Sequence, residues 1–217
     1  MFEREMRESS FLKRWAIVRT LRDQSVAEHS YFVAMYTNDI CIALDVSPEV
    51  QLRAVQYAMW HDSKDELFTS DLPGPQKKAL VSDREAFDRK LHQWSDAVFE
   101  GLDHRSGSPD DSADWGTVKR IVKLADYIDA VMEMATESQL GNRNANSVYR
   151  SLIEFMDSAL LDLGVWMGLP ANWMEELPGP DTPVLSGFAN LLCDITNGVM
   201  SAKSSESRGP FIAEIVP

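Results

Sequence analysis

Apolar residues recur at helical spacing along most of the chain. In FLKRWAIVRTL the apolar positions fall close to one stripe of a helix, so this pattern predicts a first helix over residues 11–21. The next apolar stretch, SVAEHSYFVAM, predicts a second helix whose start carries the S-x-x-E capping box of Ser25 and Glu28. Ser47 and Pro48 match the N-cap and the first position of a third helix. The N-terminal part of the chain is therefore expected to be helical.

The remaining helical pattern is interrupted mainly at prolines. The stretch TSDLPGPQKKAL is predicted to be a rigid connection. Further helices are predicted over residues 82–102, 116–138 and 146–168. Because few stretches alternate as strands do and the chain shows no internal repeat, the fold class is predicted to be all-α. We expect a compact core of residues 1–170, with residues 171–217 as a C-terminal extension packed on or capping that core in the same domain.

Composition narrows the range of partners. The length of 217 residues suits a single domain, and the net charge of −13 disfavours binding to duplex nucleic acid, although a local basic patch could still hold a small anion. No apolar run approaches membrane-spanning length, and the N-terminus is too charged for a secretory signal. The two cysteines are not at zinc-finger spacing. A cytoplasmic protein with neither a membrane nor a duplex nucleic-acid partner is expected.

Polar side chains that can bind a metal ion or move a proton follow the apolar run AVQYAMW. His61 and Asp62 come first, and Asp65 and Glu66 would lie alongside them if the helix continued. Burying this cluster is costly unless a cation compensates for it. Two interpretations stay open from these residues alone: a helix end that exposes its acids to water, or part of a site.

Two more residues of this kind lie in other predicted helices. His29 alone is more simply explained as a hydrogen-bonded core residue than as a ligand, and Asp126 begins a series with Asp129 and Glu133 that could be an exposed acidic stripe. Together with the histidine–aspartate pair, however, His29 and Asp126 complete a set of two imidazoles and two carboxylates from three helices. Such a mixed set suits a divalent transition-metal ion with open positions for water and a phosphate oxygen.

The order of these motifs resembles a known family. AEHS, HD and KLAD in succession resemble the HD-domain metal-dependent phosphohydrolases. The longer stretches RWAIVRTLRDQSVAEHS, WHDSKDELFTSDLPGPQKK and VKLADYIDAVMEMATESQLGN resemble the bacterial HD-domain 5′-deoxynucleotidases, and the resemblance spans residues 12 to about 145. It implies a compact helical HD-domain fold and a hydrolase that removes phosphate from the 5′ end of deoxynucleotides.

The resemblance also implies roles for individual residues. One divalent ion (Mn, Co, Zn, Ni or Fe) would be held by His29, His61, Asp62 and Asp126. Arg14 would bind the substrate phosphate, and Trp15 would lie near the sugar, where the family uses it to disfavour a ribose 2′-hydroxyl. Asp71 would approach the sugar hydroxyl, and Lys77 would add positive charge near the phosphate.

The acid that would handle a proton departs from the family pattern. The family has HD-x-x-E, whereas this chain has Asp65 at that position and Glu66 one residue later. The distance from HD to DLP is also one residue longer than expected. Helical spacing favours Asp65, while an inserted residue would make Glu66 the counterpart, so both are candidates for the catalytic acid or base.

The motifs are compatible with more than one substrate class, and the resemblance also bears on the oligomeric state. Deoxynucleoside monophosphates are the first expected substrates. Phage enzymes that hydrolyse dATP resemble the deoxynucleotidases closely, so a dNTP triphosphohydrolase is the alternative, and a nucleotide-binding module without turnover is a second one. The resemblance implies a homodimer or a higher homo-oligomer.

Overall fold

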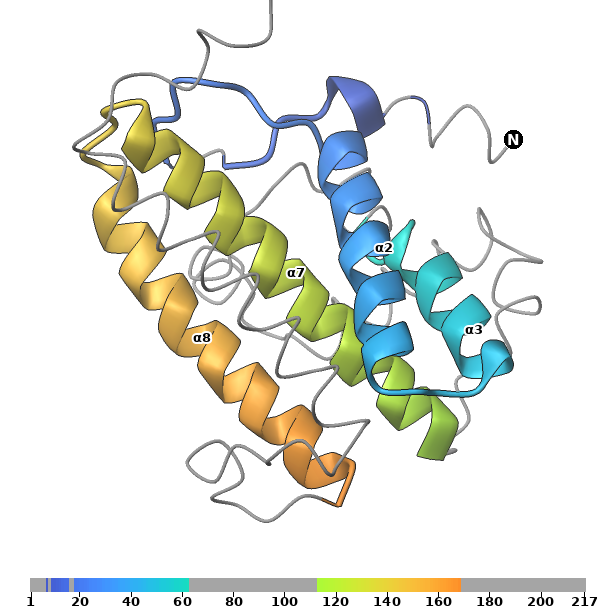
Figure 1. The fold of residues 1–217 in the computed structure, drawn as a ribbon. Coiled ribbons are helices and arrows are strands. Elements are labelled where there is room, and N and C mark those ends of the chain that lie inside the picture. The colour runs from blue at the N-terminus through green and yellow to red at the C-terminus, as the bar shows by residue number, and fades with distance from the viewer. Residues whose placement is uncertain (1–6, 8, 16–17, 63–112, 169–217) are drawn as a thin grey trace, which may run out of the picture.

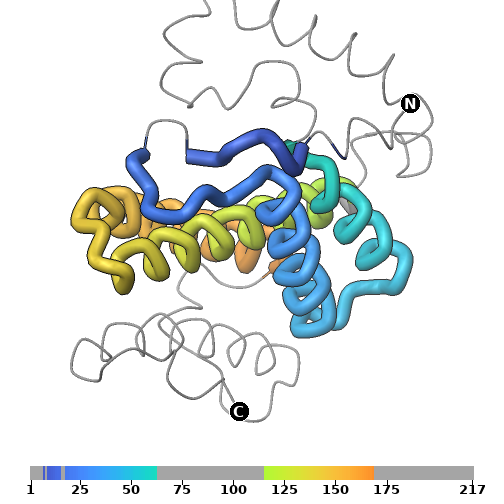
Figure 2. Tube along the Cα trace, turned by 90° about the horizontal axis from the view of Figure 1, so that it is seen from above, coloured from blue at the N-terminus to red at the C-terminus, as the bar shows by residue number. Residues whose placement is uncertain are grey.

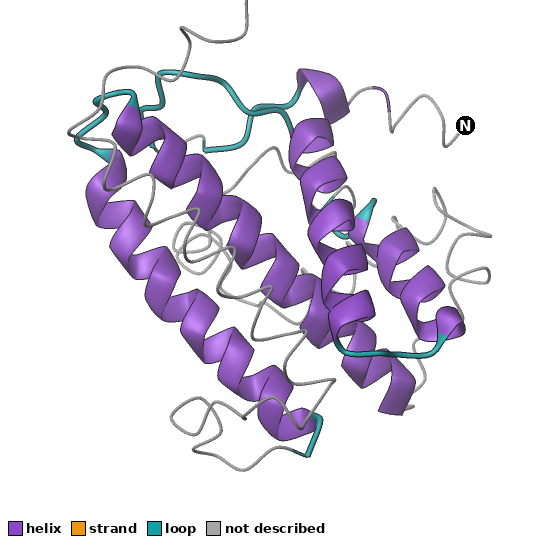
Figure 3. Cartoon of the chain, in the orientation of Figure 1, coloured by secondary structure: helices purple, strands orange, loops and turns teal. Residues whose placement is uncertain are grey.

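A computed structural model of the protein describes residues 7, 9–15, 18–62 and 113–168 (Figure 1; Figure 2 gives the view from above). The elements within these ranges are a 3-10 turn η1 (Ser9–Phe11) and the α-helices α2 (Val26–Ala43), α3 (Pro48–Ala58), α7 (Ala113–Gln139) and α8 (Ala145–Trp166). The described residues form helices, turns and loops without a β-strand (Figure 3), so the predicted all-α class is confirmed. None of these helices combines the length and apolarity that a membrane crossing requires.

The predicted starts of α2 and α3 are confirmed. Ser25 Oγ accepts a hydrogen bond from the Glu28 backbone N–H at 3.1 Å, and Glu28 Oε2 accepts one from the Ser25 N–H at 2.7 Å, which completes the capping box. Ser47 Oγ accepts from the Val50 N–H at 3.3 Å, and Pro48 lies in the first turn of α3. These bonds satisfy backbone donors that have no partner within the helix, which explains why both helices begin at these residues.

α7 is the central helix of the described fold. It lies between α8 on one side and α2 with α3 on the other (Figure 1). Val118, Leu124 and Met134 point to different faces of the helix, and all three are fully buried. α7 is therefore covered on more than one side. α7 and α8 closely match their predicted ranges.

The predicted helix over residues 11–21 is wrong. Apart from the η1 turn at its start, the described residues here run as an irregular segment, in which the Arg14 N–H donates to the Gln24 carbonyl at 2.9 Å and not to a residue four positions earlier. Phe11 and Leu21, which a helical stripe would bury, are 83% and 65% exposed. Hydrogen bonds to residues distant in sequence therefore outweigh the local apolar periodicity.

Buried Glu137 anchors this N-terminal segment, dark blue in Figure 2, to the end of α7. Its carboxylate accepts hydrogen bonds from the Leu21 and Arg22 backbone N–H groups at 2.7 and 2.9 Å and from the Asn142 side chain at 2.7 Å. Asn142 also donates to the Arg19 carbonyl at 2.7 Å. Because Glu137 has no exposed surface, these donors replace the water that an ionised carboxylate otherwise needs.

Glu137→Gln is expected to lower the free energy of unfolding by about 2 kcal/mol. The glutamine amide has an NH₂ group in place of one carboxylate oxygen, so it would face some of the N–H donors to Glu137 with a donor of its own. Burial raises the pKa of Glu137, but the hydrogen bonds from Asn142, Leu21 and Arg22 outweigh burial and lower the pKa overall. A lowered folded-state pKa gives stability that is present above the unfolded-state pKa and is lost as the pH falls through the folded-state value. In urea unfolding, the difference between wild type and E137Q should therefore shrink below about pH 4.

Glu154→Gln, on the exposed side of α8, is the matched control for this variant. Its free energy of unfolding should stay within about 0.5 kcal/mol of wild type. The anchoring role would be contradicted by an E137Q effect no larger than that of E154Q, or by a difference that persists unchanged in acid.

Candidate metal centre

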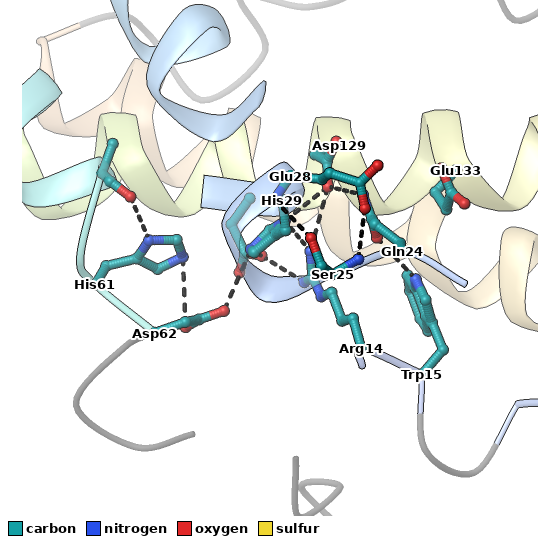
Figure 4. Close-up of polar contacts among 12 residues, drawn as sticks. Arg14, Trp15, Gln24, Ser25, Glu28, His29, His61, Asp62, Asp129 and Glu133 are labelled. Atoms are coloured by element: carbon teal, nitrogen blue, oxygen red, sulfur yellow. Dashed lines mark hydrogen bonds and ion pairs between the residues drawn. The ribbon is translucent and has the colours of Figure 1, made fainter. Parts of the chain in front are cut away.

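Four predicted ligands come together where α2, α3 and α7 meet. Each contributes one atom, and these atoms all lie within 4.8 Å of one another; the residues are His29, His61, Asp62 and Asp126. Figure 4 shows His29, His61 and Asp62 directed toward one another. The spread of 4.8 Å is only slightly more than twice a usual metal–ligand bond of about 2.1 Å, so small side-chain movements would suffice for coordination. The group could therefore hold a metal ion.

His61 is oriented by the end of α3. The helix ends at Ala58, and His61 lies in the following turn instead of within the predicted helix. Its Nδ1 is 2.8 Å from the Ala58 carbonyl oxygen, and since a carbonyl oxygen only accepts, Nδ1 carries the proton. Nε2 is left with a lone pair and is buried without a hydrogen-bond partner among the described residues. This is the form of imidazole that binds a metal ion.

His29 is oriented by α7. Its Nδ1 lies 2.6 Å from Asp129 Oδ2, while Nε2 lies 3.2 Å from Asp62 Oδ2 and 3.4 Å from Asp126 Oδ1 without forming a hydrogen bond. Burial and Arg14 lower the pKa of His29, but Asp129 and Asp62 raise it, and the net direction is upward. Proton and metal ion would compete for the same Nε2 atom. The two buried nitrogens facing the carboxylates fit a divalent ion with mixed nitrogen and oxygen ligands.

The carboxylates of Asp62 and Asp126 are held in the ionised form. Burial raises the pKa of Asp126, but the charges of Arg14 and Lys123 outweigh burial and lower the pKa to about 2. Burial also opposes ionisation of Asp62, but its histidine neighbours and Arg14 keep its pKa well below the usual range. Lys123 Nζ donates to Asp126 Oδ2 at 2.8 Å, which leaves the other oxygen facing the cluster. Both acids are therefore ready to act as ligands at neutral pH.

The Arg14–Trp15 pair lies at the ligand cluster and not on the open surface. Arg14 Nη2 donates to Asp126 Oδ1 at 2.8 Å and Nη1 to Asp129 Oδ2 at 3.3 Å; Nη1 also contacts Nδ1 of His29. The guanidinium carbon is 5.2 Å from the centre of the Trp15 ring. Trp15 has a φ of 69°, in the left-handed region that is unusual for a bulky residue. Such strained residues often occur at functional sites.

The acids of α7 do not form the exposed stripe that their spacing could have indicated. Asp129 and Glu133 are only 4% and 7% exposed. Glu133 Oε2 accepts a hydrogen bond from Arg22 at 2.8 Å, and Asp129 accepts one from the side chain of buried Gln24 at 3.0 Å. The sequence reasoning missed Gln24 and Asp129 as neighbours of the site. The available signal was the recurrence of acids on one side of an otherwise apolar helix.

The remaining predicted site residues, Asp65, Glu66, Asp71 and Lys77, lie outside the described residues, and their roles stay predictions. The same holds for the predicted helix over 82–102 and for the C-terminal extension 171–217. The choice between Asp65 and Glu66 therefore stays open.

Two solved structures of low sequence identity share the fold. An HD phosphohydrolase of cyanophage S-2L, bound to dA and one catalytic Zn²⁺ ion, matches with a TM-score of 0.60 and 21% identity over 91% of this chain and 96% of that chain. An HD-domain phosphohydrolase of Listeria innocua matches with a TM-score of 0.54 and 19% identity over 92% of this chain and 97% of that chain. The fold is that of the HD-domain phosphohydrolases.

Sequence comparison narrows the class to a family. The model of the YfbR-like 5′-deoxynucleotidase family matches residues 2–162. A 5′-deoxynucleotidase of Shewanella oneidensis is 30% identical over 158 residues, which cover 68% of this chain and 79% of that protein. A dATP triphosphohydrolase of Salmonella phage PMBT28 is 31% identical over 138 residues, 60% of this chain and 64% of that protein. The chain therefore belongs to the YfbR-like 5′-deoxynucleotidase family, and it is a hydrolase of the HD-domain class.

Loss of one ligand is expected to weaken metal binding. In isothermal titration with Co²⁺ or Zn²⁺ alone, wild type should bind about one ion per chain, and His61→Ala should bind at least about tenfold more weakly. Asp162→Asn is the control, since this carboxylate is 61% exposed and pairs with Arg120. A purely structural helical protein would give the same metal content with and without H61A, and that result would exclude a metal centre here.

Proposed function

We propose that the protein is a metal-dependent phosphohydrolase that releases inorganic phosphate from deoxynucleoside 5′-monophosphates. Membership of the 5′-deoxynucleotidase family supports this activity. The observation that carries it in this chain is the set of His29, His61, Asp62 and Asp126, whose ligand atoms lie within 4.8 Å of one another. A nucleotide-binding module that had lost turnover would be expected to have lost part of this set.

The four residues would hold one divalent transition-metal ion. Their donor set is compatible with Mn, Fe, Co, Ni or Zn, and the loading in cells would follow availability. The chemistry that such an ion supplies at the site is a lower pKa for a water molecule and partial neutralisation of a phosphate oxygen. The protein's part is to present two imidazole Nε2 atoms and two ionised carboxylates in one place without a rearrangement of the helices.

Arg14 would bind the substrate phosphate. Its side chain is 14% exposed and lies beside the ligand set, with Nη2 2.8 Å from Asp126 Oδ1. The planar fork of a guanidinium matches two phosphate oxygens, so one well-placed arginine can hold an anion on a chain whose net charge is −13. Its ion pairs with Asp126 and Asp129 would keep the guanidinium oriented toward the reacting phosphate.

The other roles rest on the family resemblance. Trp15 would lie near the sugar, Asp71 would approach the sugar hydroxyl, and Lys77 would add positive charge near the phosphate. Asp65 or Glu66 would accept or donate the proton that moves during hydrolysis. Trp15 is the member of this group that the structure describes, and its position next to Arg14 is in keeping with contact to the nucleoside.

A dNTP triphosphohydrolase is the second candidate. It is supported by the 31% identity to the dATP triphosphohydrolase of Salmonella phage PMBT28, although the match spans only 64% of that protein. The two activities share the same reacting bond to the 5′ oxygen and differ in the group that leaves. A monophosphatase releases phosphate, whereas a triphosphohydrolase releases the intact triphosphate chain.

A homodimer or higher homo-oligomer located in the cytoplasm is the proposed form of the enzyme. The family resemblance supports the assembly. Sedimentation velocity on the purified full chain should give a mass at least about twice the 24.4 kDa of one chain. A single species at the mass of one chain would contradict the proposed assembly.

Product analysis decides between the two substrates. With Mn²⁺ or Co²⁺, the protein is expected to release phosphate from deoxynucleoside monophosphates faster than it cleaves the corresponding dNTPs, and more slowly from ribonucleoside monophosphates. Chromatography of dNMP, dNDP and dNTP reactions distinguishes phosphate, pyrophosphate and triphosphate as products. If the whole panel stays intact with every plausible divalent ion, the proposed function is wrong.

Arg14→Ala is expected to lower kcat/KM by roughly 100-fold, because one charge-assisted contact to the phosphate is lost. Arg14→Lys should recover only part of the activity, since an ammonium group cannot form the bidentate contact. Arg150→Ala, an exposed position on α8, is the matched control and should leave kcat/KM unchanged. If R14A kept wild-type activity, Arg14 would not be part of the substrate site.

A further inference from the structure

A chain of buried hydrogen bonds connects Trp15 to His29. The Trp15 indole N–H can only donate, and it donates to Gln24 Oε1 at 3.0 Å. The Gln24 amide group is thereby oriented, so its Nε2 donates to Asp129 Oδ2 at 3.0 Å. His29 Nδ1 lies 2.6 Å from the same Asp129 oxygen. The first two links have a fixed donor and acceptor, and in the third His29 donates when its Nδ1 carries the proton; Figure 4 shows the members side by side.

This arrangement decides which nitrogen of His29 can bind a metal ion. Asp129 Oδ2 can only accept at Nδ1, so with Asp129 as the partner Nδ1 carries the proton and Nε2 keeps its lone pair, whereas Arg14 Nη1, which can only donate, contacts the same Nδ1 and favours the opposite tautomer. Nε2 is the atom that faces Asp62 and Asp126. A ring flip would replace the short bond to Asp129 by a C–H group, so the carboxylate also opposes rotation of the ring. Asp129 itself is not among the residues that converge as ligands.

Gln24 ties the same carboxylate to the N-terminal segment. Its backbone carbonyl accepts the Arg14 N–H at 2.9 Å, while its side chain holds the Trp15 indole. Gln24 is fully buried, so its amide has no water to replace either partner. Trp15 has the strained φ of 69°, and these contacts are among those that hold it there.

We propose that Asp129 is a positioning residue that holds the tautomer and ring orientation of His29 for metal binding, and that Gln24 couples Asp129 to Trp15. The proposal rests on the proposed metal-dependent function. Carboxylates that orient a ligand histidine typically change metal affinity by about 10- to 100-fold when they are altered. The residue acts through His29 and does not touch the reacting atoms.

A purely electrostatic role for Asp129 as the counter-ion of Arg14 is the competing explanation. The geometry favours His29, since Asp129 Oδ2 is 2.6 Å from His29 Nδ1 but 3.3 Å from Arg14 Nη1. Arg14 also has Asp126 as a closer partner, at 2.8 Å. A counter-ion would affect phosphate binding, whereas a positioning residue affects metal affinity in the absence of any nucleotide.

The test is metal affinity of the full chain measured by titration with Co²⁺ alone. Asp129→Asn, which keeps the size of the side chain, should weaken Co²⁺ binding by about tenfold, and Asp129→Ala by up to about 100-fold. Glu133→Gln is the matched control, because Glu133 is one turn further along α7, is similarly buried and bonds Arg22, not a ligand. E133Q should bind Co²⁺ as wild type does.

A second readout does not require metal. In the ¹⁵N spectrum of histidine-labelled protein, His29 of wild type should show a protonated Nδ1, and D129N or D129A should shift the population toward protonated Nε2. Gln24→Leu should cause a smaller loss of Co²⁺ affinity, and should add nothing in the D129A background, because its effect passes through Asp129.

The outcomes separate this inference from the proposed function. If wild type binds no divalent ion, the proposed function fails. If wild type binds Co²⁺ and D129N and D129A bind it equally well with an unchanged His29 spectrum, the positioning role is overturned while the function stands. An equal loss in E133Q would also overturn it, since the effect would then be general destabilisation of α7. Should D129A not fold, D129N and the His29 spectrum decide the question.

Discussion

Buried carboxylates on one side of α7 require partners, and the described part of the molecule is arranged around them. The acids recur at intervals of three or four residues and are all buried: Asp126, Asp129, Glu133 and Glu137. A desolvated charge is costly unless it is paired and hydrogen-bonded. The partners are cations, backbone N–H groups, an amide and an imidazole, and most come from the N-terminal segment before α2. The hydrogen bonds and ion pairs of these acids therefore hold the described residues from Arg14 to Gln24 against α7.

The buried acids on this side of α7 have different roles at different positions along the helix. Glu137 accepts backbone N–H groups and holds the segment in place, whereas Asp126 presents an oxygen to the ligand set. Asp129 lies between them and contacts both Gln24 of the N-terminal segment and His29 of the candidate ligand set. The anchoring and the chemistry consequently share one rigid helix, which is the preferred support for a site that needs its ligands within a few tenths of an ångström.

Much of the fold could be predicted because its signals are local, whereas the convergence of His29, His61, Asp62 and Asp126 was expected from the order of the family motifs. The capping box of Ser25, the Ser47–Pro48 start and the long apolar periods of α7 and α8 each act within a few residues. The segment over 11–21 was mispredicted as a helix because its apolar spacing is also local, while the bonds that determine its course reach α7. Burial of Asp129 and Glu133 could not be seen either, since an acid's exposure depends on which cations and amides reach it in space.

The anchoring of the N-terminal segment has a consequence for the order in which the protein forms during synthesis. Arg14 and Asp126 are 112 residues apart in sequence, and His29 and Asp129 are 100 residues apart. A nascent chain that has only α2 and α3 outside the ribosome carries an arginine and an imidazole whose partners do not yet exist. Contacts at such separation close large loops and form late. The candidate metal centre is thus among the last parts of the described fold to assemble, so a chain that ended soon after Asp62 would present His29, His61 and Asp62 without Asp126, the carboxylate that α7 contributes.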